Sequence, residues 1–253
     1  MITKAVVMTN PGKLAVEEVN IRERSVEDVI VDIHYSGIST GTEKLFWNGK
    51  MPPFPGMGYP LVPGYESTGE VVSAHKSSGL KPGDFVFVPG ADCFANPVRS
   101  LFGGAAKRIA SPAKRLIKID PGMGANGALF ALAATARHAI AGFGNKMPEV
   151  IVGHGVLGRL LARLVILAGE KPPVVWETNV LRHSGADGYE VVLPEQDARS
   201  DYNCIFDVSG DSGVLDKLIG RVCRGGEIVL AGFYPERLSF GFPQAFMKEV
   251  ALR

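Results

Sequence analysis

The stretch Val150-Ile151-Val152-Gly153-His154-Gly155-Val156-Leu157-Gly158 decides the predicted fold of this chain. Three β-branched residues predict a buried strand, and a G-x-G-x-x-G pattern then opens an amphipathic helix, Val156 to Ala168. Gly153 permits a tight turn, Gly155 lets the backbone approach a pyrophosphate, and Gly158 lets the helix pack close to the strand. Free N–H groups at the helix N-terminus suit phosphate oxygens. The sequence therefore predicts a dinucleotide-binding loop formed by Gly153, His154, Gly155, Val156, Leu157 and Gly158.

An acidic residue follows this loop at a suitable distance. Glu177 lies 24 residues after Gly153, at the end of a second predicted strand, Val174 to Trp176. A carboxylate there accepts hydrogen bonds from both ribose hydroxyls and repels a 2′-phosphate, which favours NAD over NADP as the cofactor. Arg182 is the competing feature, because an arginine near this position could hold a 2′-phosphate.

Strands alternate with helices throughout the second half of the chain. The further elements expected there are helices at 127–141 and 213–222 and strands at 202–208 and 227–232. This alternation predicts a parallel sheet with right-handed crossovers. Ligands bind at the carboxyl ends of such strands, so Ser209 and Phe233, which follow the last two strands, are candidates to touch the cofactor. Simple turn chemistry is the alternative role for both residues.

The first half of the chain has a different pattern. Short β-branched runs bounded by Gly, Pro or Asp predict strands at Lys4–Met8, Asp28–Tyr35, Ser67–Val72, Asp84–Pro89 and Leu116–Ile119. Between them, the segment from Met51 to Pro63 carries five prolines and is expected to form a rigid surface loop. We therefore expect a β-rich domain over residues 1–121 and a dinucleotide-binding domain over residues 122–253.

Composition excludes several classes of protein. Of 253 residues, 46% are hydrophobic and 21% are charged, which rules out a disordered chain, a collagen or a coiled-coil rod. Lys and Arg (27) balance Asp and Glu (26), so no overall field favours nucleic acid or an anionic membrane as a partner. The longest apolar region, 150–168, contains His154, Arg159 and Arg163 and predicts no integral membrane segment.

The cysteines predict the compartment. Cys93, Cys204 and Cys223 are odd in number and far apart, which fits neither a disulfide framework nor a zinc knuckle. We expect three free thiols and a cytoplasmic protein.

A β-rich half followed by a dinucleotide-binding half resembles the medium-chain dehydrogenase/reductase superfamily. The resemblance covers nearly the whole chain and rests on Ser36–Glu43 (SGISTGTE), Pro60–Val71 (PLVPGYESTGEV), Lys81–Val86 (KPGDFV), Gly103–Ala106 (GGAA) and the loop after Gly153. It implies an α/β and β fold, in which a GroES-like β-rich domain precedes a Rossmann domain. It also implies a possible homodimer, because superfamily members commonly dimerise through the cofactor domain.

The sequence departs from the zinc-dependent members of this superfamily. Those members carry a cysteine in the first motif and a His-Glu pair in the second, where this chain has Ser39 and the pair Tyr65-Glu66. The four-cysteine structural-zinc lobe is also missing, with only Cys93 in that region. Because Ser and Tyr are poor zinc ligands, we expect a zinc-independent member with no metal site.

A finer resemblance, over Ser36 to Glu70, is to a branch of the superfamily that acts on bacteriochlorin pigments. It implies a tetrapyrrole substrate whose 3-(1-hydroxyethyl) group is oxidised to 3-acetyl in bacteriochlorophyll biosynthesis, with NAD as hydride acceptor. Two other hypotheses stay open: a zinc-independent NADPH quinone or enone reductase, and a non-catalytic pigment-binding protein of the same fold.

Without zinc, hydrogen-bonding side chains must remove or relay the proton of the alcohol. The resemblance makes the side chains at the former metal positions the catalytic candidates: Ser39, Thr42, Glu43, Tyr65 and Glu66. Thr42 resembles the superfamily's hydroxyl relay, and Tyr65 or Glu66 is suited to take or hold the proton. The alternative is that both glutamates pair with basic residues and that Tyr65 only packs beside the site.

Aromatic and apolar side chains of the first half could line a wide cleft for a planar pigment, namely Phe46, Trp47, Phe54, Met57, Tyr59 and Phe94. The alternative is that they cover the core beneath the loops.

The last residues, Phe246 to Arg253, read like the middle of a helix. Superfamily chains continue past this point, so we expect a C-terminally truncated copy that lacks the last part of the cofactor sheet and the segment that returns to complete the first domain.

Overall fold

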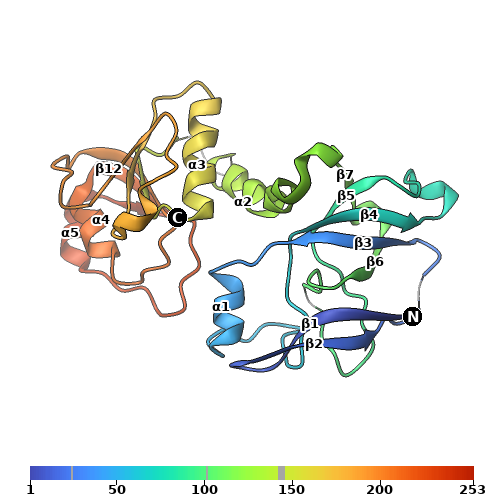
Figure 1. Cartoon of the computed structure of the whole chain (residues 1–253). Coiled ribbons are helices and arrows are strands. Elements are labelled where there is room, and N and C mark those ends of the chain that lie inside the picture. The colour runs from blue at the N-terminus through green and yellow to red at the C-terminus, as the bar shows by residue number, and fades with distance from the viewer. Residues whose placement is uncertain (24, 101, 142–145) are drawn as a thin grey trace. The chain divides into compact units, whose positions relative to one another are not determined.

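The computed structural model describes residues 1–23, 25–100, 102–141 and 146–253. The chain forms two compact units, Met1–Ala131 and Leu132–Arg253 (Figure 1). The division falls within helix α2 (Phe130–Ala141), whereas the sequence predicted a boundary between residues 121 and 122.

The first unit is built from antiparallel strands. Its strands are β1 (Ile2–Asn10), β2 (Lys13–Asn20), β3 (Asp28–Ser36), β4 (Ser67–Ser73), β5 (Phe85–Val88), β6 (Arg108–Pro112) and β7 (Ile117–Lys118). Strands β1 and β2 pair with each other, and the other five form a sheet in the order β6-β3-β4-β5-β7. Its helices are α1 (Thr42–Trp47) and the 3-10 helices η1 (Lys76–Ser78), η2 (Ala113–Arg115) and η3 (Pro121–Leu129).

The hydrophobic core of this unit lies against the five-stranded sheet. Buried residues of neighbouring strands form this core, namely Val29, Ile30 and Val31 of β3, Val71 of β4, Val86 of β5 and Ile109 of β6. Burial of these β-branched side chains explains why the strand patterns were readable from the sequence.

The proline-rich segment from Met51 to Pro63, predicted as a surface loop, is partly buried. Leu61 and Val62 are buried, and Leu61 exchanges backbone hydrogen bonds with Met8 of β1 at 2.8 and 2.9 Å. A second apolar cluster, made of Met8, Leu45, Phe46, Met51 and Leu61, holds the loop against α1 and β1. The loop is therefore anchored at its end by the core.

The second unit contains a parallel sheet in the order β10-β9-β8-β11-β12-β13. Its strands are β8 (Val150–Val152), β9 (Val174–Trp176), β10 (Glu190–Val192), β11 (Tyr202–Asp207), β12 (Val222–Leu230) and β13 (Ala251–Leu252). Its helices are α3 (Val156–Leu167), the 3-10 helix η4 (Val180–Arg182), α4 (Leu215–Arg221) and α5 (Phe242–Lys248), together with most of α2. The strand order reverses between β8 and β11, which is the switch point of a doubly wound fold.

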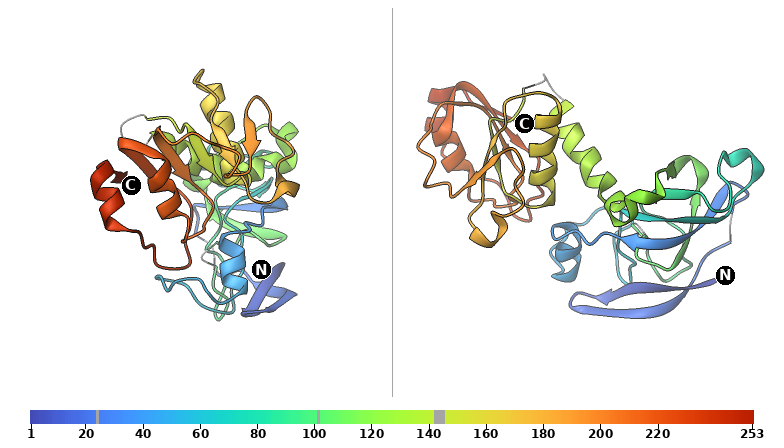
Figure 2. Two further views of the ribbon diagram at one scale, coloured as in Figure 1. Left: turned by 90° about the vertical axis from the view of Figure 1, so that its left-hand side faces the viewer. Right: turned by 45° about the horizontal axis from the view of Figure 1, so that its top comes forward.

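Helices cover both faces of this sheet (Figure 2). On one face, Ile151 of β8 packs with Leu161 and Val165 of α3 and with Ala136 of α2. On the other face, its neighbours in β8 pack with α4 and α5. Since successive strand residues alternate between two apolar layers, the strands read as continuous apolar runs in the sequence.

The end of the chain differs from the helix expected there. Helix α5 ends at Lys248, because Glu249 adopts a left-handed conformation (φ 53°) that breaks the helix. The following strand, β13, pairs in parallel with β12. Across the described residues, no helix has the length and apolar character needed to cross a membrane.

Candidate active site and cofactor loop

The three glycines of the loop after β8 occupy different environments. Gly153 has a φ of 104°, and a Cβ on it would lie 3.2 Å from the backbone of Ser209. A Cβ on Gly158 would overlap the carbonyl oxygen of Gly153. A Cβ on Gly155 would meet no described atom within 4 Å. The backbone conformation and packing therefore require glycine at positions 153 and 158. Gly155 instead leaves open space at the N-terminus of α3. The first N–H groups of that helix, including those of Val156 and Leu157, have no helical partners.

His154 is buried and holds the glycine loop to the segment that follows β9. Its Nδ1 lies 2.6 Å from the carbonyl oxygen of Arg182, and its Nε2 lies 2.8 Å from the hydroxyl of Tyr189. The carbonyl oxygen can only accept, so Nδ1 donates; in the neutral imidazole, Nε2 then accepts from the hydroxyl of Tyr189. Burial lowers the pKa of His154, in agreement with that state.

Glu177 is only 7% exposed and faces the glycine loop. Its Oε2 accepts a hydrogen bond from the N–H of His154 at 3.0 Å, and its Oε1 accepts one from the N–H of Asn179 at 2.8 Å. A carboxylate accepts about four hydrogen bonds, so both oxygens keep capacity for further donors such as ribose hydroxyls. The competing Arg182 presents an exposed side chain, and its carbonyl also accepts a hydrogen bond from Arg159 at 3.0 Å.

The loops after β11 and β12 lie next to the glycine loop. Ser209 packs against Gly153, as described above, and the carbonyl of Phe233 lies 3.1 Å from where a Cβ on Gly210 would be. The N–H groups of Ala231 and Gly232 both donate to the carbonyl of Asp207 at 2.9 Å. The structure therefore brings Ser209 and the Phe233 backbone to the carboxyl-terminal edge of the sheet, where the Phe233 side chain is exposed.

In the first unit, the pairing of β3 with β4 brings two distant motifs together. Ser36 pairs with Ser67 in the sheet, and the next N–H, that of Gly37, donates to the carbonyl of Glu66 at 2.7 Å. A Cβ on Gly37 would lie 2.5 Å from Oε1 of Glu66, so a side chain at this position would displace the carboxyl group of Glu66. The start of α1 and the Tyr65-Glu66 pair consequently share one neighbourhood.

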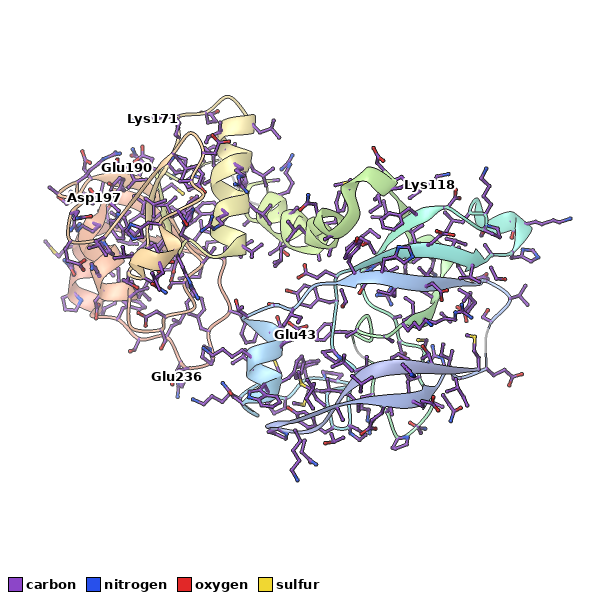
Figure 3. The ribbon with its side chains drawn as sticks, viewed as in Figure 1. Glu43, Lys118, Lys171, Glu190, Asp197 and Glu236 are labelled. Carbon is purple, nitrogen blue, oxygen red and sulfur yellow. The ribbon has the colours of Figure 1, made fainter. Side chains whose placement is uncertain are left out.

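Thr42 and Glu43 are the first two residues of α1, and Ser39 lies just before this helix (Glu43 is labelled in Figure 3). Oε2 of Glu43 accepts a hydrogen bond from the N–H of Ser39 at 2.8 Å, and Oγ of Ser39 accepts one from the N–H of Thr42 at 3.2 Å. These two hydrogen bonds hold the segment before α1 against its first turn and restrict the side chains of Ser39 and Glu43.

Glu43 and Glu66 form a buried pair of carboxyl groups, 6% and 3% exposed. Burial raises the pKa of both, and the charge of Glu43 further raises the pKa of Glu66, to about 7. Among the described residues, Oε1 of Glu43 and Oε2 of Glu66 have no hydrogen-bond partner, and neither residue has an ion-pair partner. The expectation that these glutamates pair with basic residues is therefore wrong within that part of the chain.

The half-buried Tyr65 connects this pair to the hydroxyl groups of α1. Burial raises the pKa of Tyr65, hydrogen bonding to the side chains of Ser39 and Thr42 lowers it, and the nearby charges of Glu66 and Glu43 raise it. Tyr65 thus lies within interaction distance of the other four catalytic candidates.

This donor set does not fit zinc. Zinc sites in proteins usually combine thiolate or imidazole ligands with at most one or two carboxylates. The cluster contains two carboxyl groups and the hydroxyls of Ser39 and Tyr65, but it offers neither a thiolate nor an imidazole. Among the described residues, no group of three or more His, Cys, Asp or Glu side chains is placed to hold a metal ion.

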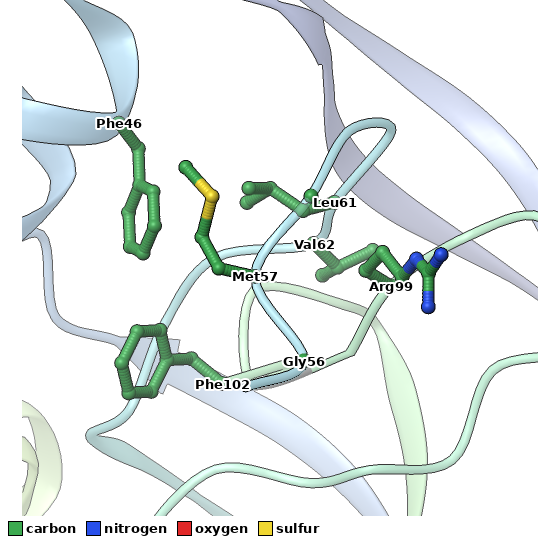
Figure 4. Close-up of a pocket in the computed structure, with 8 residues that line it drawn as sticks. Phe46, Gly56, Met57, Leu61, Val62, Arg99 and Phe102 are labelled. Atoms are coloured by element: carbon green, nitrogen blue, oxygen red, sulfur yellow. The ribbon is translucent and has the colours of Figure 1, made fainter. Parts of the chain in front are cut away.

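The candidate pigment-stacking residues divide into two groups. Phe46 and Phe94 are core residues, so the alternative role holds for them. Phe46, Met57, Leu61 and Phe102 line an apolar cavity of about 10 Å³ (Figure 4). A cavity of this volume has room for no more than one water molecule. Phe54, Met57 and Tyr59 pack half-buried against the same cluster. Trp47, by contrast, is 42% exposed.

The sequence did not single out three residues that support these sites. No sequence motif indicated a supporting role for Gly37 or Tyr189, because the residues that they contact, Glu66 and His154, are distant in sequence. Tyr234 directly follows Phe233 but carried no predicted role; its hydroxyl donates to Oδ2 of Asp207 at 2.7 Å.

Comparison with known proteins identifies similar chains. The alcohol dehydrogenase GroES-like domain model matches residues 25–121. The chain is 59% identical over 253 residues to the 2-desacetyl-2-hydroxyethyl bacteriochlorophyllide A dehydrogenase of Rhodobacter capsulatus, covering 100% of this chain and 81% of that protein. It is 57% identical over 257 residues to the protein of the same name from Cereibacter sphaeroides, with the same coverage.

Solved structures share the fold at low sequence identity. The 2R,3R-butanediol dehydrogenase of Bacillus subtilis superposes with a TM-score of 0.81 at 20% identity, over 99% of this chain and 83% of that one. Acetophenone reductase of Geotrichum candidum, in complex with NAD, gives 0.80 at 20% identity over 100% and 82%. The predicted GroES-like domain followed by a Rossmann sheet is confirmed.

Proposed function

The chain belongs to the 2-desacetyl-2-hydroxyethyl bacteriochlorophyllide A dehydrogenase family within the medium-chain dehydrogenase/reductase superfamily, and we propose that it oxidises the hydroxyethyl group of a bacteriochlorophyllide to an acetyl group in bacteriochlorophyll biosynthesis. The observation that carries this proposal is the identity of 59% along the whole chain. The residues of both candidate sites suit such a reaction, in which a secondary alcohol loses a hydride and a proton.

The second unit is the proposed binding site for NAD. Gly155 leaves room for a pyrophosphate beside the N-terminus of α3, and Glu177 keeps acceptor capacity for ribose hydroxyls. NAD held by these residues would supply the acceptor for the hydride that leaves the carbinol carbon. The same carboxylate repels a 2′-phosphate, which supports NAD rather than NADP.

The first unit supplies the proposed proton acceptor. Glu66 is suited to that role, because its pKa of about 7 lets it exchange a proton near neutral pH. Glu43 supports it by keeping its pKa high, and the hydroxyls of Tyr65, Ser39 and Thr42 offer a relay toward it. In each turnover the substrate hydroxyl loses its proton to this cluster, which returns it to solvent, while the carbon–oxygen double bond forms. No step in this scheme requires a metal.

Trp47 is the proposed contact for the pigment. An indole ring offers a flat apolar surface that stacks on a conjugated macrocycle, and this ring is exposed on α1, the helix that carries Thr42 and Glu43. A cytoplasmic location and a homodimer stay proposals; free Cys93, Cys204 and Cys223 fit the first.

The proposal is tested by incubating the full chain with hydroxyethyl bacteriochlorophyllide and either NAD or NADP, while pigment and nicotinamide spectra are recorded together. Formation of acetyl pigment with NAD, at least tenfold faster than with NADP, is the expected result. Reduction of quinones with NADPH, without pigment oxidation, would favour the quinone or enone reductase hypothesis. Pigment binding without turnover by any cofactor would favour the non-catalytic hypothesis.

A further inference from the structure

A buried hydrogen-bonded pair joins two loops of the second unit. Asp207, at the end of β11, is completely buried, and its Oδ2 accepts the 2.7 Å hydrogen bond from the hydroxyl of Tyr234, which follows β12. Its Oδ1 accepts the N–H of Ser209 at 2.9 Å. Burial raises the pKa of Asp207, the donors of Ser209 and Tyr234 lower it, and the charge of Asp211 raises it. The reaction described above uses neither side chain.

The two loops that the pair connects are in close backbone contact. A Cβ on Gly232 would lie 3.3 Å from the nitrogen of Gly210, and Gly210 itself has a φ of 73°. Glycines at such contacts provide no side chains to lock the loops together. The Asp207–Tyr234 hydrogen bond therefore supplies a side-chain link between them.

The position of these loops indicates which half of a dinucleotide they face. A doubly wound sheet consists of two mononucleotide-binding halves on either side of the switch point. The half with β8, β9 and β10 contains the glycine loop and Glu177, which suit the pyrophosphate and the adenosine ribose. The other half, with β11, β12 and β13, consequently faces the nicotinamide mononucleotide.

We propose that Asp207 and Tyr234 are positioning residues, which hold Ser209 and Phe233 in place for the nicotinamide half of the cofactor. The inference rests on the proposed dinucleotide binding. It predicts that breaking the pair weakens binding of the nicotinamide half and leaves binding of the adenosine half unchanged.

The same unit contains a matched control. The hydroxyl of Tyr202 donates to Oδ2 of Asp197 at 2.5 Å, another Tyr–Asp bond (Asp197 is labelled in Figure 3). Tyr202 is the first residue of β11 and Asp207 is the last, so the control pair lies at the opposite end of the strand from the cofactor edge.

The test uses the full chain and the variants Tyr234→Phe, Asp207→Asn and Tyr202→Phe. Dissociation constants are measured for NADH and for ADP-ribose, which lacks nicotinamide, and thermal unfolding is followed for each variant. For Tyr234→Phe we expect NADH affinity to fall about tenfold, which is the effect of losing one hydrogen bond to a charged group. ADP-ribose affinity should stay within about twofold of its original value. For Asp207→Asn we expect a smaller loss, because the amide can accept from Ser209 and donate to Tyr234.

Tyr202→Phe should lower thermal stability but leave both affinities unchanged. The proposal is overturned if Tyr234→Phe binds NADH like the unchanged protein, or if it loses NADH and ADP-ribose affinity equally, since a general structural role would weaken both. Absence of NADH binding by the unchanged protein would overturn the proposed function as well, which separates the two failures.

Discussion

The backbone N–H of His154 donates a hydrogen bond to Oε2 of Glu177 across a sequence separation of 23 residues. This contact joins the glycine loop at the end of β8 to the acid at the end of β9. It follows from the parallel pairing of Val152 with Trp176, which places the residues after the two strands side by side. The two features that predicted dinucleotide binding are therefore parts of one site.

Two substitutions in the glycine loop should separate binding from packing. Gly155→Ala should fold normally, because its backbone is ordinary (φ −75°) and the new methyl group meets no described atom within 4 Å. The methyl group would occupy space needed by the pyrophosphate, so NADH affinity should fall about tenfold or more. Gly158→Ala should instead lower stability, by about 1–3 kcal/mol, because its Cβ overlaps Gly153. Equal thermal unfolding of the two variants would contradict this assignment.

Glu177→Gln should reduce the discrimination between NAD and NADP. The amide keeps one acceptor but loses the charge that repels a 2′-phosphate, so the ratio of kcat/KM for the two cofactors should fall about tenfold. Glu190→Gln, which neutralises an exposed acid on β10, is the control and should leave the ratio unchanged. An unchanged ratio in the Glu177 variant would remove the argument for NAD preference.

Stability should fall as pH rises from about 4.5 to about 7. The folded-state pKa of Glu66 is about 7 against an ordinary value of 4.5, so the folded state binds more protons than the unfolded state in this window. Its ionisation then costs on the order of 3 kcal/mol of stability by pH 8. Glu66→Gln should flatten this dependence in denaturant titrations at several pH values, whereas Glu70→Gln, at an exposed position of β4, should not.

The same group should control the pH dependence of turnover. Because Glu66 must be ionised to accept the proton, kcat/KM for pigment oxidation should rise with pH to a plateau above about 7. Glu66→Gln should lose at least about 100-fold in kcat while NADH affinity stays unchanged. Retention of full activity and of the same pH profile in this variant would assign the proton acceptor elsewhere.

Trp47→Ala should raise the KM for the pigment about fivefold without lowering the free energy of unfolding, since the indole is exposed and is proposed to stack on the macrocycle. Phe246→Ala, which removes an exposed ring from α5, is the control. If both variants keep the original KM, the pigment contact lies elsewhere.

The sequence was most informative where strands are buried on both faces. The strands β8 and β9 were predicted residue for residue, because each is a short apolar run next to a glycine loop or an acid. Strand β2 was missed because nearly all of its residues are exposed, so that it shows no buried apolar run. Strand β10 was missed because it is only three residues long, Glu190–Val192. The strand β13 was missed because a left-handed Glu249 ends α5 without a glycine signal.

The candidate site could be predicted only in part for a similar reason. The identities of Glu43 and Glu66 were clear from their motifs, but their burial, with no basic partner among the described residues, depends on the pairing of β3 with β4. Likewise, the exposure that separates Trp47 from its buried neighbour Phe46 depends on which side of α1 packs on the loop cluster. Such tertiary contacts join residues too far apart in sequence for a motif to reveal.

The most direct test of the central claim follows the hydride itself. Hydroxyethyl bacteriochlorophyllide that carries deuterium on the carbinol carbon is incubated with the full chain and NAD, and the products are analysed by mass spectrometry. The account predicts one deuterium in the reduced cofactor for each acetyl pigment formed. Acetyl pigment formed without deuterium in the reduced cofactor, or no turnover while both NAD and pigment bind, would contradict it.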